Sequence, residues 1–274
     1  MTHILFIGDI VGKPGRELVR RGLAPLVAHH RIDLVIANGE NCAAGFGITP
    51  DLAEDLFSYG VHVITGGNHS WDKKEIYPYI ANHPRLLRPA NFPAGTPGRG
   101  RVVVKADNGV PVAVINAMGR VFMHQLDDPF TGILSEIDAV KGDARIIFVD
   151  FHAEATSEKV AMGWHLDGRA TAVVGTHTHV PTADARLLLQ GTAYITDVGM
   201  TGPHDSVIGV ERHPIIQRFL TGLPQRFETA RDNPRLNAVV VTADEATGRA
   251  TAIERLSLST DDIEALVAAP AVAR

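Results

Sequence analysis

The chain has 274 residues, 45% of them hydrophobic and 21% charged, and carries a formal net charge of −5. This is the composition of an ordinary globular protein, and its acidic balance argues against a broad electrostatic surface for nucleic acid. One cysteine, Cys42, excludes both an intrachain disulfide and a zinc cluster of thiolates. No run reaches the roughly 20 apolar residues of a membrane-spanning helix, and the start lacks a signal-peptide pattern. We therefore expect a cytoplasmic protein without a membrane partner.

The first part of the chain alternates short apolar runs with helical segments. β-Branched runs bounded by glycine predict strands, and apolar residues at helical spacing predict the helices between them. Pro25 lies inside the first helical segment and predicts a kink or an early end there. The predicted strands are 3–7, 34–37 and 61–65; the helices follow the loop 10–15, begin at Thr49-Pro50, and run from near Lys73 to Pro84.

The middle and the end of the chain add hairpins to this pattern. Asp107-Asn108-Gly109 predicts a tight turn between strands at 101–105 and 112–116. Residues 119–144 are predicted to form a small excursion with one helix near 132–140, which could cover the site. Further strands are predicted at 146–149, 172–174, 186–189, 193–196, 238–242 and 251–258.

These elements predict an α/β fold. Parallel-type strands early and hairpins late favour two packed β-sheets flanked by helices over a doubly wound sheet. The length suits one large domain, which we expect over residues 1–265, with a frayed tail at 266–274.

Five of the predicted strands end in side chains that bind metals, and this recurrence is the strongest signal in the sequence. In α/β proteins, sites form beyond the carboxyl ends of the strands, so these residues predict one composite metal centre. Carboxylate, amide and imidazole donors without thiolate suit Fe, Mn, Zn or Co. The strand ends carry Asp9, Glu40-Asn41, Asn68-His69, Asp150 with His152, and His177 with His179.

The pair His177 and His179 is a weaker signal when taken alone. Two polar loop residues hydrogen-bonded to the backbone explain such a pair equally well. With His152 and Asn68 at two other strand ends, metal binding becomes the favoured interpretation. Two-metal hydrolysis also requires a ligand that bridges the ions, and a carboxylate with two oxygens suits this role. Glu40 is our prediction for the bridge.

Two short blocks, Gly66-Gly67-Asn68-His69 and Gly175-Thr-His-Thr-His179, resemble the Asn-His and His-x-His blocks of the calcineurin-like metallophosphoesterases. Four longer strings resemble the bacterial YmdB-type branch, whose members are dinuclear phosphodiesterases that cleave cyclic nucleotides. The resemblance runs from about residue 4 to residue 210, and it implies the four-layer α/β/β/α sandwich of the metallophosphoesterases. The four strings are Gly8-Asp-Ile-Val-Gly-Lys-Pro-Gly15, Asn38-Gly-Glu-Asn41, Asp150-Phe-His-Ala-Glu-Ala-Thr-Ser-Glu-Lys159 and Ile195-Thr-Asp-Val-Gly-Met-Thr-Gly-Pro203.

The resemblance also implies how the ligands divide between two metal ions. Val11 stands where the superfamily has a histidine, and Asn41 is expected to fill that gap. The expected cofactors are two divalent or mixed-valence transition metal ions, Fe or Mn, with Zn or Co as alternatives. One ion is then held by Asp9, Glu40, Asn41 and His179, and the other by Glu40, Asn68, His152 and His177.

His69 directly follows Asn68 and is our candidate catalytic residue. By resemblance it is not a ligand but faces the substrate and protonates the leaving oxygen. An alkoxide leaves poorly unless it is protonated, and histidine titrates near neutrality. The alternative is a histidine that only orients Asn68. Glu154 also has two interpretations: it caps the following turn, or it holds a ligand histidine.

The sequence therefore predicts a dinuclear metal-dependent phosphodiesterase. The substrate class, 2′,3′- or 3′,5′-cyclic nucleotides, follows from the resemblance alone, and the expected mechanism is attack by a hydroxide that bridges the metals. The alternatives are a phosphomonoesterase on the same metal core and a non-catalytic regulatory protein that binds metal. The expected partner is a small phosphodiester substrate, and no residue is predicted to bind it. Direct nucleic-acid binding is not expected, and the formation of a homo-oligomer is left open.

Overall fold

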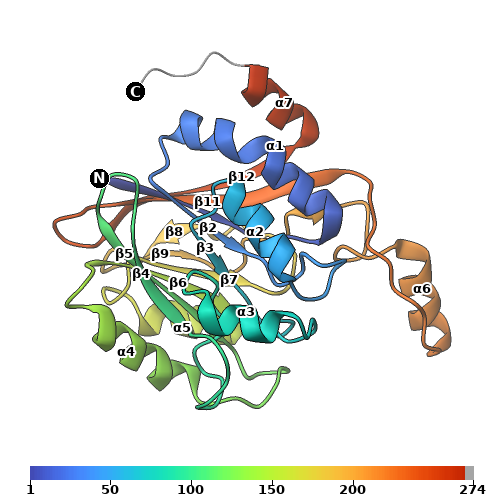
Figure 1. The fold of residues 1–274 in the computed structure, drawn as a ribbon, viewed down its shortest axis with the longest axis horizontal. Helices are drawn as coiled ribbons and strands as arrows, with labels where there is room; N and C mark the ends of the chain where they lie inside the picture. The colour runs from blue at the N-terminus through green and yellow to red at the C-terminus, as the bar shows by residue number, and fades with distance from the viewer. Residues whose placement is uncertain (269–274) are drawn as a thin grey trace.

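The computed structural model describes residues 1–268, which form two six-stranded sheets lying face to face (Figure 1). The first sheet contains β1 (Thr2–Ile7), β2 (Leu34–Asn38), β3 (Val63–Thr65), β10 (Gly202–Pro203), β11 (Pro234–Ala243) and β12 (Ala250–Ser259). Its order is β10-β11-β1-β2-β3, with β12 beside β11. The strands β1, β2 and β3 are parallel, whereas β11 is antiparallel to both β1 and β12.

The second sheet contains β4 (Arg101–Lys105), β5 (Pro111–Met118), β6 (Ile146–His152), β7 (Ala172–Thr176), β8 (Arg186–Leu187) and β9 (Ala193–Ile195). Its order is β4-β5-β6-β7-β9-β8. The strands β5, β6, β7 and β9 are parallel, and β4 pairs antiparallel with β5. The predicted hairpin around residues 107–109 is therefore confirmed.

Both faces of the central strands are apolar, because each sheet is covered on both sides. In β1, Ile4 and Phe6 face the other sheet, whereas Leu5 and Ile7 face the helices. The ring of Phe6 stacks on that of Phe148 in β6, with 5.4 Å between the centroids. Burial on both faces explains why these strands read as continuous apolar runs rather than alternating ones.

Helices cover both outer faces, so the molecule has four layers: helices, sheet, sheet and helices (Figure 1). The expected pair of sheets flanked by helices is confirmed. One helix, α6 (Arg212–Thr221), projects from the edge of the sandwich (Figure 1). The first sheet is covered by α1 (Gly12–His30), α2 (Pro50–Ser58), α3 (Ile76–Asn82) and α7 (Thr260–Ala268), and the second by α4 (Pro129–Val140) and α5 (Thr156–His165).

Pro25 neither ends α1 nor interrupts it, because the helix continues to His30. A proline in a helix interior removes one backbone hydrogen bond and costs about 3 kcal/mol. Leu23 and Leu26 flank the proline and are buried in the core beneath the first sheet. Tertiary packing on either side of the proline therefore offsets the local cost.

The segment 119–144 lies differently from our expectation. Its helix, α4, begins at Pro129 because the side chain of Asp128 accepts hydrogen bonds from the first backbone N–H groups. The buried face of α4, with Ile133 and Ile137, packs on the outer face of the second sheet. This helix therefore covers the sheet and not the site.

The end of the described chain is also more ordered than we expected. Residues 266–268 continue α7 instead of fraying, and Leu266 packs against the core of the first sheet. Ile263 of α7 lies against Gly22 of α1. The remainder of the predicted tail, 269–274, lies outside the described residues. Among the helices found in residues 1–268, none could span a lipid bilayer.

Candidate metal centre

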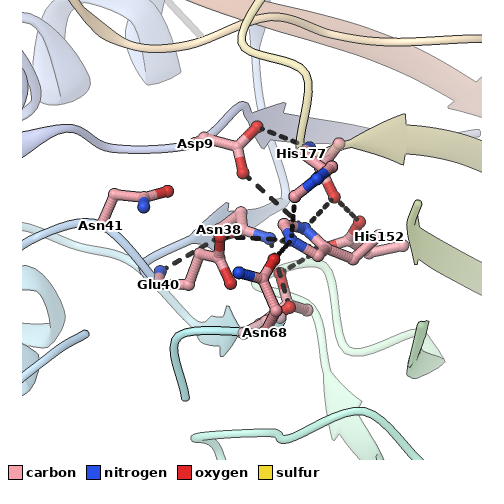
Figure 2. A network of polar contacts seen from close by, with 12 residues as sticks. Asp9, Asn38, Glu40, Asn41, Asn68, His152 and His177 are labelled. Carbon is pink, nitrogen blue, oxygen red and sulfur yellow. Dashed lines mark hydrogen bonds and ion pairs between the residues drawn. The ribbon is translucent and has the colours of Figure 1, made fainter. Parts of the chain in front are cut away.

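All the predicted ligands lie at or just beyond the carboxyl ends of parallel strands. Figure 2 labels all of them except His179. The strands β1, β2 and β3 of one sheet and β6 and β7 of the other bring them to one edge of the sandwich. This is where sites in α/β sheets form. The structure thus brings together residues from five separate parts of the chain: Asp9, Glu40, Asn41, Asn68, His152, His177 and His179.

The tightest group surrounds the ring of His152 (Figure 2). Its Nε2 atom lies 3.1 Å from Glu40 Oε1 and 3.1 Å from His177 Nδ1. The same nitrogen lies 2.9 Å from Asn68 Oδ1. Glu40, His152 and His177 each offer one potential ligand atom, and these three atoms lie within 4.8 Å of one another. These four residues are the ones expected at the second metal position.

Gly67 explains how the group can be so compact. A Cβ atom at Gly67 would lie 2.2 Å from Glu40 Oε2 and 2.3 Å from the ring of His152. Any other residue would therefore displace either the carboxylate or the imidazole. The glycine before Asn68 is required by the close approach of these side chains.

The tautomer of His152 follows from two buried hydrogen bonds. The hydroxyl of Thr176 donates to Asp150 Oδ1 at 2.7 Å, so its oxygen accepts from His152 Nδ1, 2.9 Å away. In the neutral ring Nδ1 therefore carries the proton, and Nε2 is the nitrogen that can bind a metal. Asp150 itself also accepts from Thr65 and Asn38, which fixes the carboxylate.

His177 is held in a similar way. Its Nε2 atom lies 2.9 Å from Glu154 Oε2, so Nε2–H donates to that carboxylate and Nδ1 faces His152. Of the two interpretations of Glu154, the structure supports the one in which it holds a ligand histidine. Such carboxylate partners orient metal ligands in many metalloproteins.

Asn41 and His179 face each other at the position expected for the first metal. The amide of Asn41 donates to the carbonyl of Gly45 at 2.8 Å, which leaves its Oδ1 facing His179 Nε2 at 3.3 Å. His179 Nδ1 donates to the carbonyl of Ile208 at 2.8 Å, so in the neutral ring it is Nε2 that carries no proton. Two lone pairs at this distance repel unless a cation lies between them.

Asp9 completes this first position. The carboxylate is fully buried, and Oδ2 accepts the backbone N–H of His177 at 3.2 Å. Its Oδ1 atom has no hydrogen-bond partner among residues 1–268. A buried carboxylate oxygen without a partner is costly, and coordination to a metal ion is one way to satisfy it. The donors at both positions thus fit transition metal ions.

The electrostatics of the centre favour a cation. Burial raises the pKa of Asp9. Burial also opposes charge on Glu40, but the neighbouring His152 and His69 hold the pKa of this carboxylate low. Burial likewise opposes charge on His152, but Glu40 and Asp9 raise the pKa of this imidazole. The pKa of His177 falls to about 3 because of burial and of the adjacent His152, so this ring is neutral and can bind a metal.

The loop that carries His177 and His179 has an anchor that our sequence analysis missed. Both histidines have left-handed backbone conformations, with φ of 100° and 66°. Thr178 between them donates its N–H and its hydroxyl to Asp197 Oδ2, at 3.2 and 2.8 Å. Lys159 Nζ donates to the same oxygen at 2.6 Å. The buried ion pair therefore holds the turn that aims both imidazoles.

The sequence does contain a signal for this pair. Lys159 and Asp197 lie in two of the strings that carry the resemblance, at 150–159 and 195–203. Both side chains are 1% exposed. Lysine and aspartate are almost never fully buried unless paired. Without a structure, however, nothing linked these two residues to each other.

His69 lies beside the centre and lines a cavity with it. Its backbone N–H donates to Glu40 Oε2 at 3.1 Å, and its ring Nδ1 lies 2.8 Å from Asp72 Oδ2. Because Asp72 occupies Nδ1, Nε2 is the ring atom available to a ligand. The ring also meets that of Phe46 edge-on, with 5.2 Å between the centroids.

The cavity over the centre has a volume of about 740 Å³. One end contains predicted site residues, including Glu40, His69 and His177. Its outer wall comes from residues 207–229, which include part of α6. None of the lining residues belongs to 119–144, the segment that we expected to cover the site.

Comparisons with known proteins agree with this arrangement. A family model described as YmdB-like protein matches residues 5–256. A 2′,3′-cyclic-nucleotide 2′-phosphodiesterase of Bacillus subtilis (strain 168) is 53% identical over 259 residues, covering 94% of this chain and 98% of that protein.

Two solved structures are similar over 94% of this chain. One is a hypothetical protein from Thermus thermophilus, with 43% identity, a TM-score of 0.88 and coverage of 99% of that chain. The other is described as a novel phosphatase from Mycoplasma pneumoniae, with 36% identity, a TM-score of 0.89 and coverage of 93% of that chain. The four-layer sandwich is therefore the fold of these proteins.

Proposed function

Because the chain belongs to the YmdB-like family, we propose that it is a metal-dependent phosphodiesterase that hydrolyses 2′,3′-cyclic nucleotides. The sequence left the 2′,3′ and 3′,5′ forms open, and the name of the Bacillus subtilis relative supports the first. Cleavage of the 2′ ester leaves a nucleoside 3′-phosphate. The observation that carries the proposal is the close approach of Glu40, His152 and His177, whose possible ligand atoms lie within 4.8 Å of one another.

The proposed cofactors are two transition metal ions, Fe or Mn, with Zn or Co as alternatives. When bound, they would neutralise phosphate oxygens and lower the pKa of a water molecule, which makes it nucleophilic near neutral pH. Glu40 is the proposed bridge, since Oε1 faces His152 and Oε2 faces the N–H of His69. The first position would use Asp9, Glu40, Asn41 and His179, and the second Glu40, Asn68, His152 and His177.

His69 is the proposed general acid. It lines the cavity beside Glu40, and Asp72 holds its Nδ1 so that Nε2 faces the substrate. A proton given from Nε2 to the departing 2′ oxygen would prevent formation of a free alkoxide. Such assistance contributes about 10²- to 10⁴-fold in typical enzymes.

A panel of four substrates tests the proposal on protein with a measured metal content. Adenosine 2′,3′-cyclic phosphate should be hydrolysed faster than the 3′,5′ isomer and than bis-p-nitrophenyl phosphate, and its product should be the 3′-phosphate. p-Nitrophenyl phosphate should be the poorest substrate. A preference for this monoester would favour a phosphomonoesterase, which the description of the Mycoplasma pneumoniae structure also suggests.

Absence of turnover with all four substrates, in protein with both metals bound, would favour the non-catalytic regulatory alternative. A cytoplasmic location stays a prediction, and the oligomeric state stays open. Direct binding of nucleic acid stays unexpected, because the chain is acidic overall.

A further inference from the structure

The cavity over the metal centre continues well beyond the predicted ligands. Away from Glu40 and His177, its wall is mainly apolar. The apolar side chains come from the loop after β2, the loop after β7 and the segment 207–229. They include Phe46, Val180, Val207, Ile208, Ile215 and Phe227.

A cyclic nucleotide has two chemically different ends that must share this one cavity. Its phosphate is charged and must lie at the metal ligands. Its base is planar and largely apolar on its faces, and the apolar end of the same cavity is the matching surface. Resting on the proposed function, we propose that Phe46, Ile208 and Phe227 form the subsite for the nucleobase.

Phe46 belongs to the apolar part of the wall and contacts one of the predicted site residues. Its ring contacts the ring of His69, the residue proposed to protonate the departing sugar oxygen. The sugar therefore lies next to Phe46 when its 2′ oxygen lies at His69. The base, attached to that sugar, then extends from Phe46 along the apolar wall.

Phe227 brings an aromatic face and a cation to the same wall. The guanidinium of Arg218 lies over its ring, 5.2 Å from the centroid. Arg218 is the one lysine or arginine among residues 1–268 that lines the cavity, and it makes no ion pair within that range. Its donors are therefore free for a ribose hydroxyl or the edge of a base.

A hydroxyl in the same wall also lacks a partner. Thr229 Oγ1 is buried, and no described residue forms a hydrogen bond with it. Thr229 lies against Gly12 and Gly45, close to the loop that carries Phe46. Because this oxygen is buried, a nucleoside would reach it only after the side chain of Thr229 turned toward the cavity.

The chemistry of the wall also predicts weak selectivity among bases. Stacking on aromatic rings tolerates every base, because each has a π-face. Few side chains of the wall have polar groups that could read a base edge. We therefore expect purine and pyrimidine 2′,3′-cyclic nucleotides to be used with similar kcat/KM.

Phe227→Ala is the test, with Phe122→Ala as the matched control. Phe227 is only half-buried, and Phe122 is exposed and outside the cavity, so both variants should fold. The Phe227 variant should raise KM for adenosine 2′,3′-cyclic phosphate on the order of tenfold, equivalent to about 1.4 kcal/mol. It should leave metal content and kcat/KM for a base-free ester, methyl riboside 2,3-cyclic phosphate, unchanged. The control variant should change the kinetic constants for neither substrate.

Binding of adenosine and uridine, followed by saturation-transfer NMR, separates this inference from the proposed function. Both nucleosides should bind the wild type and the control, and bind more weakly to the Phe227 variant. If the wild type hydrolyses cyclic nucleotides but binds no nucleoside, the subsite is wrong and the function stands. If it binds nucleosides but hydrolyses no cyclic nucleotide, the function is wrong and the subsite stands.

Two further outcomes would overturn the subsite. Equal losses with the nucleotide and the base-free ester would mean that Phe227 supports the metal centre rather than the base. A change in molar mass of the Phe227 variant, measured by light scattering, would mean that this wall is a contact between copies of the chain.

Discussion

The two proposed metal positions are supported in different ways, although both would use Glu40. At the second position, His152 belongs to β6 and is fixed by the buried hydroxyl of Thr176. At the first position, His179 lies in a loop and is fixed by the backbone carbonyl of Ile208, whose side chain is exposed. The sheet therefore preorganises one position, whereas a surface segment supports the other.

This difference predicts an order of filling. Ligands held in place before binding lose less conformational freedom when the metal arrives. We therefore expect the second position to bind metal more tightly than the first. The variants below would break or sharpen this contrast.

Glu40→Ala should have the largest effect, because it removes the one ligand that both positions share. Both metals should be lost, and turnover should fall by at least about 10⁴-fold, since the metals supply several kcal/mol of charge stabilisation. Elemental analysis and turnover of bis-p-nitrophenyl phosphate would measure this. Glu40→Gln keeps the size of the side chain and tests the need for its charge. A variant that retained both metals would refute the bridging role.

His69→Ala should separate catalysis from metal binding at either position. His69 offers its backbone N–H to Glu40, which alanine retains, and its ring to the cavity. Turnover should fall by roughly 10²- to 10³-fold, with two metals still bound per chain. Loss of metal along with activity would instead assign the ring to coordination. Asp72→Asn is the milder companion, since it alters only the partner of Nδ1.

Asp197→Asn should weaken both positions together, because Asp197 holds the turn between His177 and His179. Removal of one partner of a buried ion pair costs about 3–5 kcal/mol of the free energy of unfolding. Metal affinity should fall by about 10- to 100-fold. Denaturant unfolding and metal titration would report the two effects separately.

A second change distinguishes the loop anchor from the buried charge. Lys159→Met in the Asp197→Asn background leaves no unpaired charge, so the free energy of unfolding should largely recover. Metal affinity should stay low, because asparagine has one acceptor oxygen and cannot serve both Thr178 and Gly199. Recovery of both the free energy of unfolding and the metal affinity would show that Asp197 acts only by neutralising the buried charge of Lys159.

The convergence of the proposed ligands was predictable from sequence because each of them follows a short buried strand. Strand periodicity and the polar residue after it are local signals, and parallel strands bring their carboxyl ends to one edge. The helix α5 was not predicted, since two of its buried residues are polar. Glu158 accepts hydrogen bonds from the backbone of Arg120 and Val121, and Lys159 pairs with Asp197. Those partners are distant in sequence, so no local pattern predicts that these polar residues are buried.

The part of the cavity wall that α6 forms was also not predicted. In α5 some buried residues are polar, whereas in α6 some apolar residues are exposed. In α6, Phe219 and Leu220 are largely exposed although they are apolar. Each lies four residues after an isoleucine, Ile215 or Ile216. Apolar residues at this helical spacing predict a face buried against a core, but α6 projects from the sandwich (Figure 1). A pattern of apolar residues indicates that a helix forms. It does not indicate which surface that helix will cover.

The smallest effects should come from the partners that orient the two imidazoles of the second position. Thr176→Val keeps the shape of a fully buried side chain but leaves His152 Nδ1 and Asp150 Oδ1 without a hydrogen bond. Apparent affinity for Mn²⁺ at the second position should fall by about 10-fold or more, as for other partners of metal ligands.

Glu154→Gln should have less effect than Thr176→Val on the same titration, although Glu154 also holds an imidazole. Its side chain is 47% exposed, so water can replace it, and glutamine still offers an oxygen to His177 Nε2. The change in affinity should be about twofold, as for a typical exposed substitution. If both variants weakened Mn²⁺ binding equally, burial of the supporting hydrogen bonds would not be what makes the second position rigid.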